Sequence, residues 1–171
     1  MTDRFKTIRP AALKASIFKL IDQDWMLITA GTAKSWNTMT ASWGGLGTLW
    51  NKPVAFAFVR PTRFTCGFME RSEQFTLSFF AARYRKALAF CGSHSGRDVD
   101  KARETGLEPL SPVPGVVSFR QTRMVLVCRK LYTTDIDPAR FLDPGIDKLY
   151  PKKDYHRVYV GEVVRLLRAG R

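Results

Sequence analysis

Short apolar runs of strand length recur along this chain, each closed by residues that interrupt regular structure. Val54 to Val59 is the clearest run, because every residue in it is apolar, Pro53 precedes it and Arg60-Pro61 follows. Such a run bounded by turn signals is typical of a buried strand, and the proline forces a break. Similar patterns predict strands at residues 25–29, 37–43, 75–80, 116–119, 123–133 and 155–166.

Helical patterns are few and short. Apolar residues spaced by three and four over residues 81–91, with alanines among them, predict one helix that Gly92 ends. A second helix is expected over residues 65–72. Asp98 or Asp100 is a suitable N-cap for a third short helix. None of these segments is long enough to organise the fold alone.

The elements together predict a mainly β fold in a single domain over residues 1–171. About six or seven strands with two or three short helices, in no regular strand–helix–strand order, favour a β-barrel with a few peripheral helices. A chain of 171 residues can bury a full hydrophobic core without disulfides or metals. Its 45% apolar and 25% charged residues are ordinary for a folded soluble domain, which argues against disorder.

The chain is strongly basic. A net charge of +13 comes from 28 Lys and Arg against 15 Asp and Glu, and it favours phosphorylated ligands or polyanions. A nucleic-acid-binding protein usually concentrates its basic residues on one helix or tail. Here they spread from Arg4 to Arg171 without a run of five, so a basic surface is favoured over nucleic-acid binding.

Cysteine usage and hydropathy indicate a cytoplasmic protein. Cys66, Cys91 and Cys128 form no Cys-x-x-Cys pattern and cannot all pair, so each is expected to be a small buried apolar residue in a reducing compartment. No apolar run approaches the ~20 residues of a membrane span. Contact with a membrane is therefore not expected.

Hydrolytic and metal-dependent chemistry find little support. The chain has no G-x-G-x-x-G, P-loop, His-Glu-x-x-His or nucleophile elbow. Its only histidines are His94, expected on a loop surface, and His156, expected on a barrel strand with its ring outward. No catalytic side chain and no metal site are assigned.

Several ordered segments resemble the flavin reductase-like family of FMN-binding split-barrel proteins, close to flavoredoxin. They are residues 37–47, 51–56, 60–65, 75–80, 91–101 and 153–162. The resemblance covers roughly residues 20 to 166. It implies an FMN-binding split β-barrel, a homodimer with FMN near the subunit interface, and two-electron chemistry at the flavin ring.

The same resemblance places one strand along the flavin. The residues assigned there are Asn37, Thr38, Met39, Thr40, Ala41, Ser42 and Trp43. Small hydroxyl and amide side chains alternate with larger ones, so the strand can offer backbone N–H groups to the flavin edge. Such donors would stabilise negative charge that develops when the ring is reduced.

Two basic segments are candidates for the cofactor phosphate. Arg60 and Arg63 flank Pro61-Thr62, and Thr65 lies at an expected helix start, which together make a phosphate cradle. Ser95, Gly96 and Lys101 could supply a second anion contact, either to FMN phosphate across a dimer or to nicotinamide nucleotide. The segment could equally be a helix-capping loop.

The leading hypothesis is an NAD(P)H-dependent flavin reductase. Hydride passes directly between nicotinamide C4 and flavin N5 once the rings stack, so no acid or nucleophile is required. One alternative is an electron carrier of the flavoredoxin kind, with a protein redox partner as donor. Another is a basic nucleic-acid-binding module without cofactor.

Overall fold

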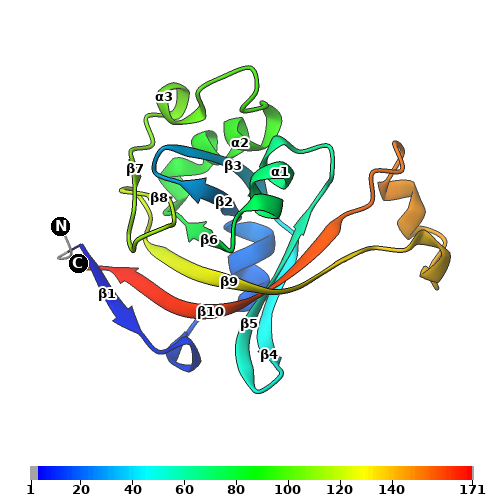
Figure 1. Ribbon diagram of the computed structural model, residues 1–171, viewed down its shortest axis with the longest axis horizontal. Coiled ribbons are helices and arrows are strands. Elements are labelled where there is room, and N and C mark those ends of the chain that lie inside the picture. Colours follow the sequence, from blue (N-terminus) through cyan, green and yellow to red (C-terminus); the bar gives the residue numbers. More distant parts are fainter. Residues whose placement is uncertain (1–3, 171) are drawn as a thin grey trace.

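One antiparallel sheet dominates this computed structural model, which describes residues 4–170 (Figure 1). Within that range seven strands pair in the order β3-β2-β6-β9-β10-β5-β4, and β1 adds to β10. The strands are β1 (Phe5–Ile8), β2 (Met26–Thr32), β3 (Ser35–Ala41), β4 (Gly44–Leu49), β5 (Lys52–Val59), β6 (Gln74–Phe79), β9 (Met124–Asp135) and β10 (Arg157–Ala169). A separate pair joins β7 (Pro109–Leu110) to β8 (Ser118–Phe119).

The sheet curls around one main core and has a second apolar layer outside. Along β2, Met26 and Ile28 pack into the main core, while Leu27 packs with Leu88 and Cys91 on the opposite face. A strand covered on both faces needs no polar alternation, which explains the unbroken apolar run that begins β2. The expected mainly β fold with peripheral helices is confirmed.

Three short α-helices accompany the sheet within residues 4–170. They are α1 (Phe64–Arg71), α2 (Arg85–Ser93) and α3 (Lys101–Thr105). Asp100 is the N-cap of α3, because its carboxylate accepts hydrogen bonds from the backbone N–H groups of Ala102 and Arg103. Single helical turns lie at Pro10–Ala12, Lys19–Gln23, Ala82–Tyr84, Pro138–Arg140 and Ile146–Leu149.

The expected end of α2 at Gly92 is wrong. The helix continues through Gly92 to Ser93. A Cβ on Gly92 would lie 3.2 Å from the Thr40 Cβ, and the Thr40 hydroxyl donates a 2.5 Å hydrogen bond to the Leu88 carbonyl. The glycine therefore allows α2 to lie close against β3 rather than ending the helix.

One strand ends earlier than predicted, and the stretch that follows it is a strand that was not predicted. The strand expected over 37–43 is β3, which ends at Ala41, before Ser42 and Trp43. The glycine-rich stretch after it forms β4, which pairs with β5 through Gly44 to Leu49. Glycines give no hydrophobic pattern, so only the pairing with β5 reveals this strand.

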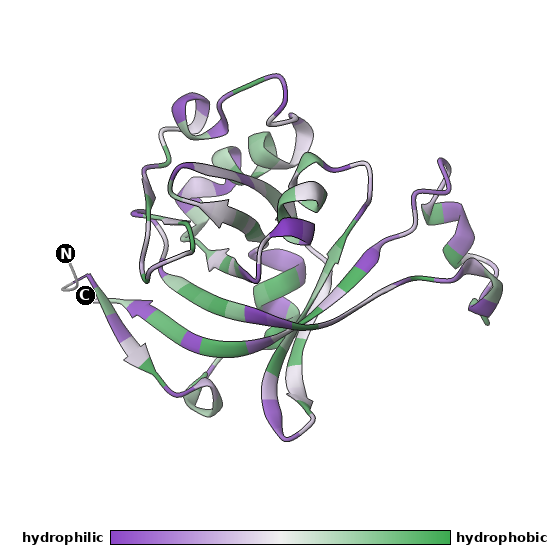
Figure 2. Cartoon of the chain, in the orientation of Figure 1, coloured by the Kyte–Doolittle hydropathy of each residue, from purple (hydrophilic) through white to green (hydrophobic). Residues whose placement is uncertain are grey.

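The connection between β9 and β10 projects away from the barrel as an arm over residues 136–156 (Figure 1). The strands that cross the barrel are mostly apolar in Figure 2, whereas the arm carries many hydrophilic residues.

None of the helices among residues 4–170 is long and apolar enough to cross a membrane. Cys66, Cys91 and Cys128 are all free and buried, as expected.

Gly161 provides a test of how closely the barrel is packed. Its added Cβ would lie 2.8 Å from ring carbons of Phe75 and 2.9 Å from the Cys128 Cβ, at a register shift in β10. Gly161→Ala should therefore lower the free energy of unfolding by roughly 1–3 kcal/mol through overpacking. Urea denaturation measures the change.

Gly47→Ala is the matched control, since nothing lies within 4 Å of an added Cβ at this strand position. It should change stability by no more than about 0.5 kcal/mol. Equal stability in the two variants would mean that the side chains around Gly161 move to accommodate the added methyl group, which would contradict the close packing.

Candidate functional site

Two adjoining cavities lie where β3, the 60–65 loop, the 93–101 loop and the arm meet. The larger has a volume of about 460 Å³ and the smaller about 150 Å³, and Met39, Arg60 and Arg63 line both. The larger reaches Lys101 at one side and Asp154 at the other. The smaller is bounded by Trp43, Phe58 and His156.

The structure brings nearly all sequence-predicted site residues to these cavities. The larger cavity is lined by Asn37, Met39, Arg60, Arg63, Thr65, Ser95, Gly96 and Lys101. The smaller is lined by Met39, Thr40, Ala41, Ser42, Trp43, Arg60 and Arg63. Segments that are distant in sequence therefore meet at one place.

Thr38 is the exception. Its side chain is 1% exposed and lies 2.8 Å from the Thr29 hydroxyl in a hydrogen bond. Successive side chains of a strand point to opposite faces, so Thr38 lies on the face of β3 away from Met39. Only its carbonyl approaches the site, where it accepts a bond from Lys101.

Thr65 does not cap α1 as expected. The N-cap is Arg63, and Thr65 lies inside the helix at 1% exposure. The Asn37 side-chain amide donates a 2.8 Å hydrogen bond to the Thr65 hydroxyl, which joins β3 to α1. A Cβ on Gly96 would lie 2.0 Å from the Asn37 Oδ1, so only glycine fits where the 93–101 loop meets this pair.

Two cations of the site satisfy the C-terminal carbonyl groups of α2. Arg63 donates a 2.6 Å bond to the Gly92 carbonyl, and Lys101 donates to the Cys91 carbonyl at 2.7 Å and the Thr38 carbonyl at 2.8 Å. Positive groups at this end of a helix complement its dipole. Burial, with a contribution from nearby Arg63, lowers the pKa of Lys101 to about 8.

Arg60 connects the site to the arm. Its guanidinium donates to the Asp154 carboxylate at 2.7 Å and to the Leu149 carbonyl at 3.0 Å, and it stacks over the Tyr150 ring at 4.9 Å. Thr62 donates to the other Asp154 oxygen at 3.1 Å. Arg60 therefore holds the arm against the 60–65 loop as well as lining both cavities.

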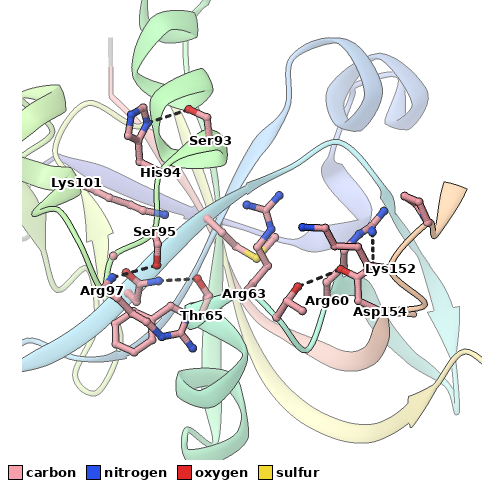
Figure 3. A pocket seen from close by; sticks show the side chains of 16 residues that line it. Arg60, Arg63, Thr65, Ser93, His94, Ser95, Arg97, Lys101, Lys152 and Asp154 are labelled. Atoms are coloured by element: carbon pink, nitrogen blue, oxygen red, sulfur yellow. Dashed lines mark hydrogen bonds and ion pairs between the residues drawn. The ribbon is translucent and has the colours of Figure 1, made fainter.

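Two further cationic side chains line the larger cavity and make few contacts with the rest of the protein. Arg97 lies over the Phe64 ring at 4.7 Å, and Lys152 makes no hydrogen bond or ion pair among the described residues. Figure 3 shows Arg97 and Lys101 toward one end, Arg60 and Lys152 toward the other, and Arg63 between them. The cavity can thus surround an anionic group with positive charge.

The outward orientation expected for His156 is wrong. Its ring is 7% exposed, and its Nδ1 shares a 2.8 Å hydrogen bond with the Tyr150 hydroxyl. Burial, assisted by the Arg60 charge, lowers the pKa of His156 to about 4, so the ring is neutral at physiological pH. His94, in contrast, is exposed as expected and stacks on Phe90.

Sequence reasoning missed several lining residues. His156 and Asp154 lie in the resembling segment 153–162, and Arg97 lies in segment 91–101. The family resemblance of those two segments was the sequence signal that could have assigned these three residues to the site. Phe58 and Lys152 carried no comparable signal, because a strand aromatic is usually core and an isolated lysine usually faces solvent.

The neutral His156 makes stability depend on pH. In the unfolded chain the imidazole takes up a proton near pH 6.5, whereas in the fold it does so near pH 4. The unfolded state therefore binds more protons between these values, and stability falls as the pH falls through them. The loss due to this ring should reach up to roughly 3 kcal/mol by pH 4.

The measurement compares urea unfolding of the protein and of His156→Gln from pH 7 to pH 4. The difference in stability between the two should narrow as the pH falls, because the variant lacks this titration. His94→Gln removes the exposed histidine and is the matched control. A difference for His156→Gln that narrows no more than that of the control would contradict the buried neutral ring.

Comparisons with known proteins agree on one family. The model of the flavin reductase like domain matches residues 19–170. The FMN-binding domain of a flavin reductase-like enzyme from Shewanella baltica OS155 superposes with a TM-score of 0.68 and 16% identity, over 98% of this chain and 78% of that one. No curated protein sequence matches the chain.

Other solved structures share the fold at low identity. Flavoredoxin from Methanosarcina acetivorans has a TM-score of 0.66 and 19% identity, over 91% of this chain and 75% of that one. The NADH:FAD oxidoreductase of Streptomyces globisporus C-1027 has a TM-score of 0.63 and 18% identity, over 85% and 75%. Since the domain match spans nearly the whole chain, this protein belongs to the flavin reductase-like domain family.

Proposed function

We propose that this protein is an FMN-binding oxidoreductase that transfers hydride between NAD(P)H and flavin. The observation that carries the proposal is the junction of two unlike cavities at β3, one bounded by flat aromatic rings and one lined by cations. FMN has two matching halves, a planar ring system and a dianionic phosphate. Membership of the flavin reductase-like family supports the same conclusion.

The ring half suits the smaller cavity. Trp43, Phe58 and His156 bound it, and the chain from Met39 to Ser42 forms one side. Among residues 4–170, β3 pairs with β2 alone, so its outward N–H and C=O groups, apart from the Thr38 carbonyl that Lys101 binds, are available to a ligand. Backbone donors there would hold the polar edge of a flavin and orient the ring.

The phosphate half suits the larger cavity. Arg63, Lys101 and Arg97 supply positive charge there, and Ser95 supplies a hydroxyl. A dianion placed among them would favour the charged form of Lys101, whose pKa burial holds low, at about 8. We therefore infer that Arg60, Arg63 and Lys101 retain the cofactor while also holding the site together.

The residues of the chain position and tune rather than react. FMN bound here would supply a two-electron acceptor. Backbone donors of β3 could stabilise the negative charge that develops on the flavin ring when it is reduced. His156 stays neutral and holds a hydrogen bond with Tyr150 beside Trp43. Trp43 is 42% exposed, so its neighbourhood is open for a nicotinamide ring to approach.

The first experiment titrates the protein with FMN and follows the visible absorption of the flavin. Arg63→Ala should weaken FMN binding at least roughly tenfold, since a charge-assisted contact to phosphate is lost. Arg103→Ala is the control, because this exposed arginine on α3 lines neither cavity. Equal FMN affinity in both variants would remove Arg63 from the site.

The loaded protein is then mixed anaerobically with NADH and, separately, with NADPH. Rapid bleaching of the flavin band supports a reductase and identifies the donor. A flavin that stays oxidised would instead assign the protein as a flavoredoxin-type electron carrier with a protein donor. Failure to bind FMN at all would overturn the proposal and favour the alternative that the basic surface binds nucleic acid.

We also propose that the protein is a cytoplasmic homodimer. Exposed apolar side chains on the β4–β5 turn, β9 and the arm support this, and two of them, Trp50 and Tyr132, lie edge to face with ring centroids 6.1 Å apart. They are Trp50, Tyr132, Leu142 and Leu149. The three free buried cysteines fit a reducing compartment.

Sedimentation equilibrium should therefore give a mass of about twice the 19.4 kDa chain. Leu142→Glu, at a fully exposed arm residue, should shift the equilibrium toward monomer because the interface would bury an unpaired charge. Lys14→Glu, at an exposed residue outside the apolar set, serves as the charge control. A monomeric mass for the unmodified protein at micromolar concentration would contradict the proposal.

A further inference from the structure

A further cavity reaches the barrel core beside the N-terminal segment and has no role in the function proposed above. Its volume is about 320 Å³, and it shares no lining residue with the two cavities of the candidate site. The main core forms its inner wall, through Leu126 of β9 with Val163 and Leu166 of β10. Leu46 and Thr48 of β4 form a second side. The cavity is therefore an unfilled part of the barrel packing.

Residues 9–17, here called the N-terminal strap, form the outer side of this cavity. They follow β1, and their first turn is visible below β10 in Figure 1. Leu13, Ala15 and Ile17 line the cavity while the residues between them do not, so alternate side chains of the strap face inward. Ala15 is small and exposed. The cavity is thus unfilled and open to solvent at the middle of this inward row.

The strap is held in place by apolar contacts rather than by hydrogen bonds to the barrel. Its own backbone bonds are local, from Ala12 to the Arg9 carbonyl and from Leu13 to the Pro10 carbonyl. No backbone hydrogen bond in the described part of the chain joins residues 10–17 to a barrel strand. A segment with so few buried hydrogen bonds opens at a low cost in free energy. The strap can therefore admit a ligand while the strands behind it stay folded.

The lining of the cavity defines the chemistry of a ligand. Among residues 4–170, no charged side chain lines it, although the net charge of the chain is +13. Thr48 supplies a hydroxyl, and the remaining lining side chains are apolar, apart from Gly47, which has none. An ion would lose its hydration here without gaining a partner, whereas a neutral apolar molecule would be transferred favourably out of water.

We propose that this cavity binds a small neutral apolar molecule of the size of two or three aromatic rings. A volume of about 320 Å³ lies at the small end of the range for ligand pockets. The N-terminal strap closes over the ligand, and Ala15 leaves the room that it occupies. The proposal is independent of the function proposed above, because none of its residues lines the two cavities of the candidate site.

The first test titrates the protein with N-phenylnaphthylamine, a neutral probe whose fluorescence rises in apolar surroundings. Ala15→Phe should weaken binding at least roughly tenfold, because the added ring takes the space between Leu13 and Ile17. Ala12→Phe is the matched control, since it adds the same ring at an exposed strap residue that does not line the cavity. It should change the affinity less than about twofold. Absence of probe binding, or equal loss in both variants, would overturn the proposal.

Melting temperatures of the same variants test whether the space is open. Ala15→Phe should melt no lower than the unmodified protein, because an apolar ring that fills a cavity is stabilising. A lower melting temperature for Ala15→Phe than for Ala12→Phe would mean that the added ring overpacks the core, and it would contradict an open cavity.

The second test uses the unmodified protein and distinguishes the occupants. Naphthalene should displace the probe at least roughly tenfold more effectively than naphthoate, which has the same rings and a carboxylate. Equal displacement would contradict the neutral chemistry of the site. The affinity for the probe should also be independent of protein concentration. An affinity that falls as the concentration rises would assign this face to a contact between copies of the chain and overturn the proposal.

Discussion

The incomplete pairing of the sheet is the constraint on which the rest of the structure depends. β3 and β4 follow one another in the chain, yet they stand at opposite ends of the strand order and are not paired. Closure of the barrel there would use the outward backbone groups of β3 within the sheet. Because the barrel stays split, the outward backbone groups of β3 have no strand partner among residues 4–170. Lys101 binds the Thr38 carbonyl there, and β2 holds the strand in place from its other edge.

The cations of the site serve the scaffold as well as any anionic ligand. Arg63 and Lys101 bond the last carbonyls of α2, and Arg60 fastens the arm through Asp154. A side chain already held by hydrogen bonds of this kind loses little further conformational freedom when a ligand binds. These three side chains are therefore arranged in advance, and none of them can be exchanged without affecting the packing of α2 or the arm.

Local patterns predicted those elements whose burial follows from their own sequence. β5 was visible because an apolar run lies between prolines, and Asp100 was visible as a cap because caps are short-range contacts. β4 was not, since its strand character depends on β5. Thr65 looked like a cap by residue type, but its contact with Asn37, distant in sequence, decides its position inside α1.

The residues that line the two cavities were predicted better than the hydrogen bonds that their side chains make. The residues came from segments of family resemblance, and all but Thr38 line the cavities. What those segments could not supply was the partner of each side chain, such as Gly92 for Arg63 or Tyr150 for His156. These partners are set by how α2 and the arm fold back on the barrel, which no local pattern encodes.

The positive charge gathered in the larger cavity affects the stability of the protein. Arg63, Lys101 and Arg97 line one cavity in a chain of net charge +13, so their positive charges repel one another and an anion among them would relieve that repulsion. Any anion that binds only the native state adds to its stability by mass action. An inorganic phosphate ion that bound in this cavity would therefore raise the melting temperature measured in a phosphate buffer above that measured in an amine buffer.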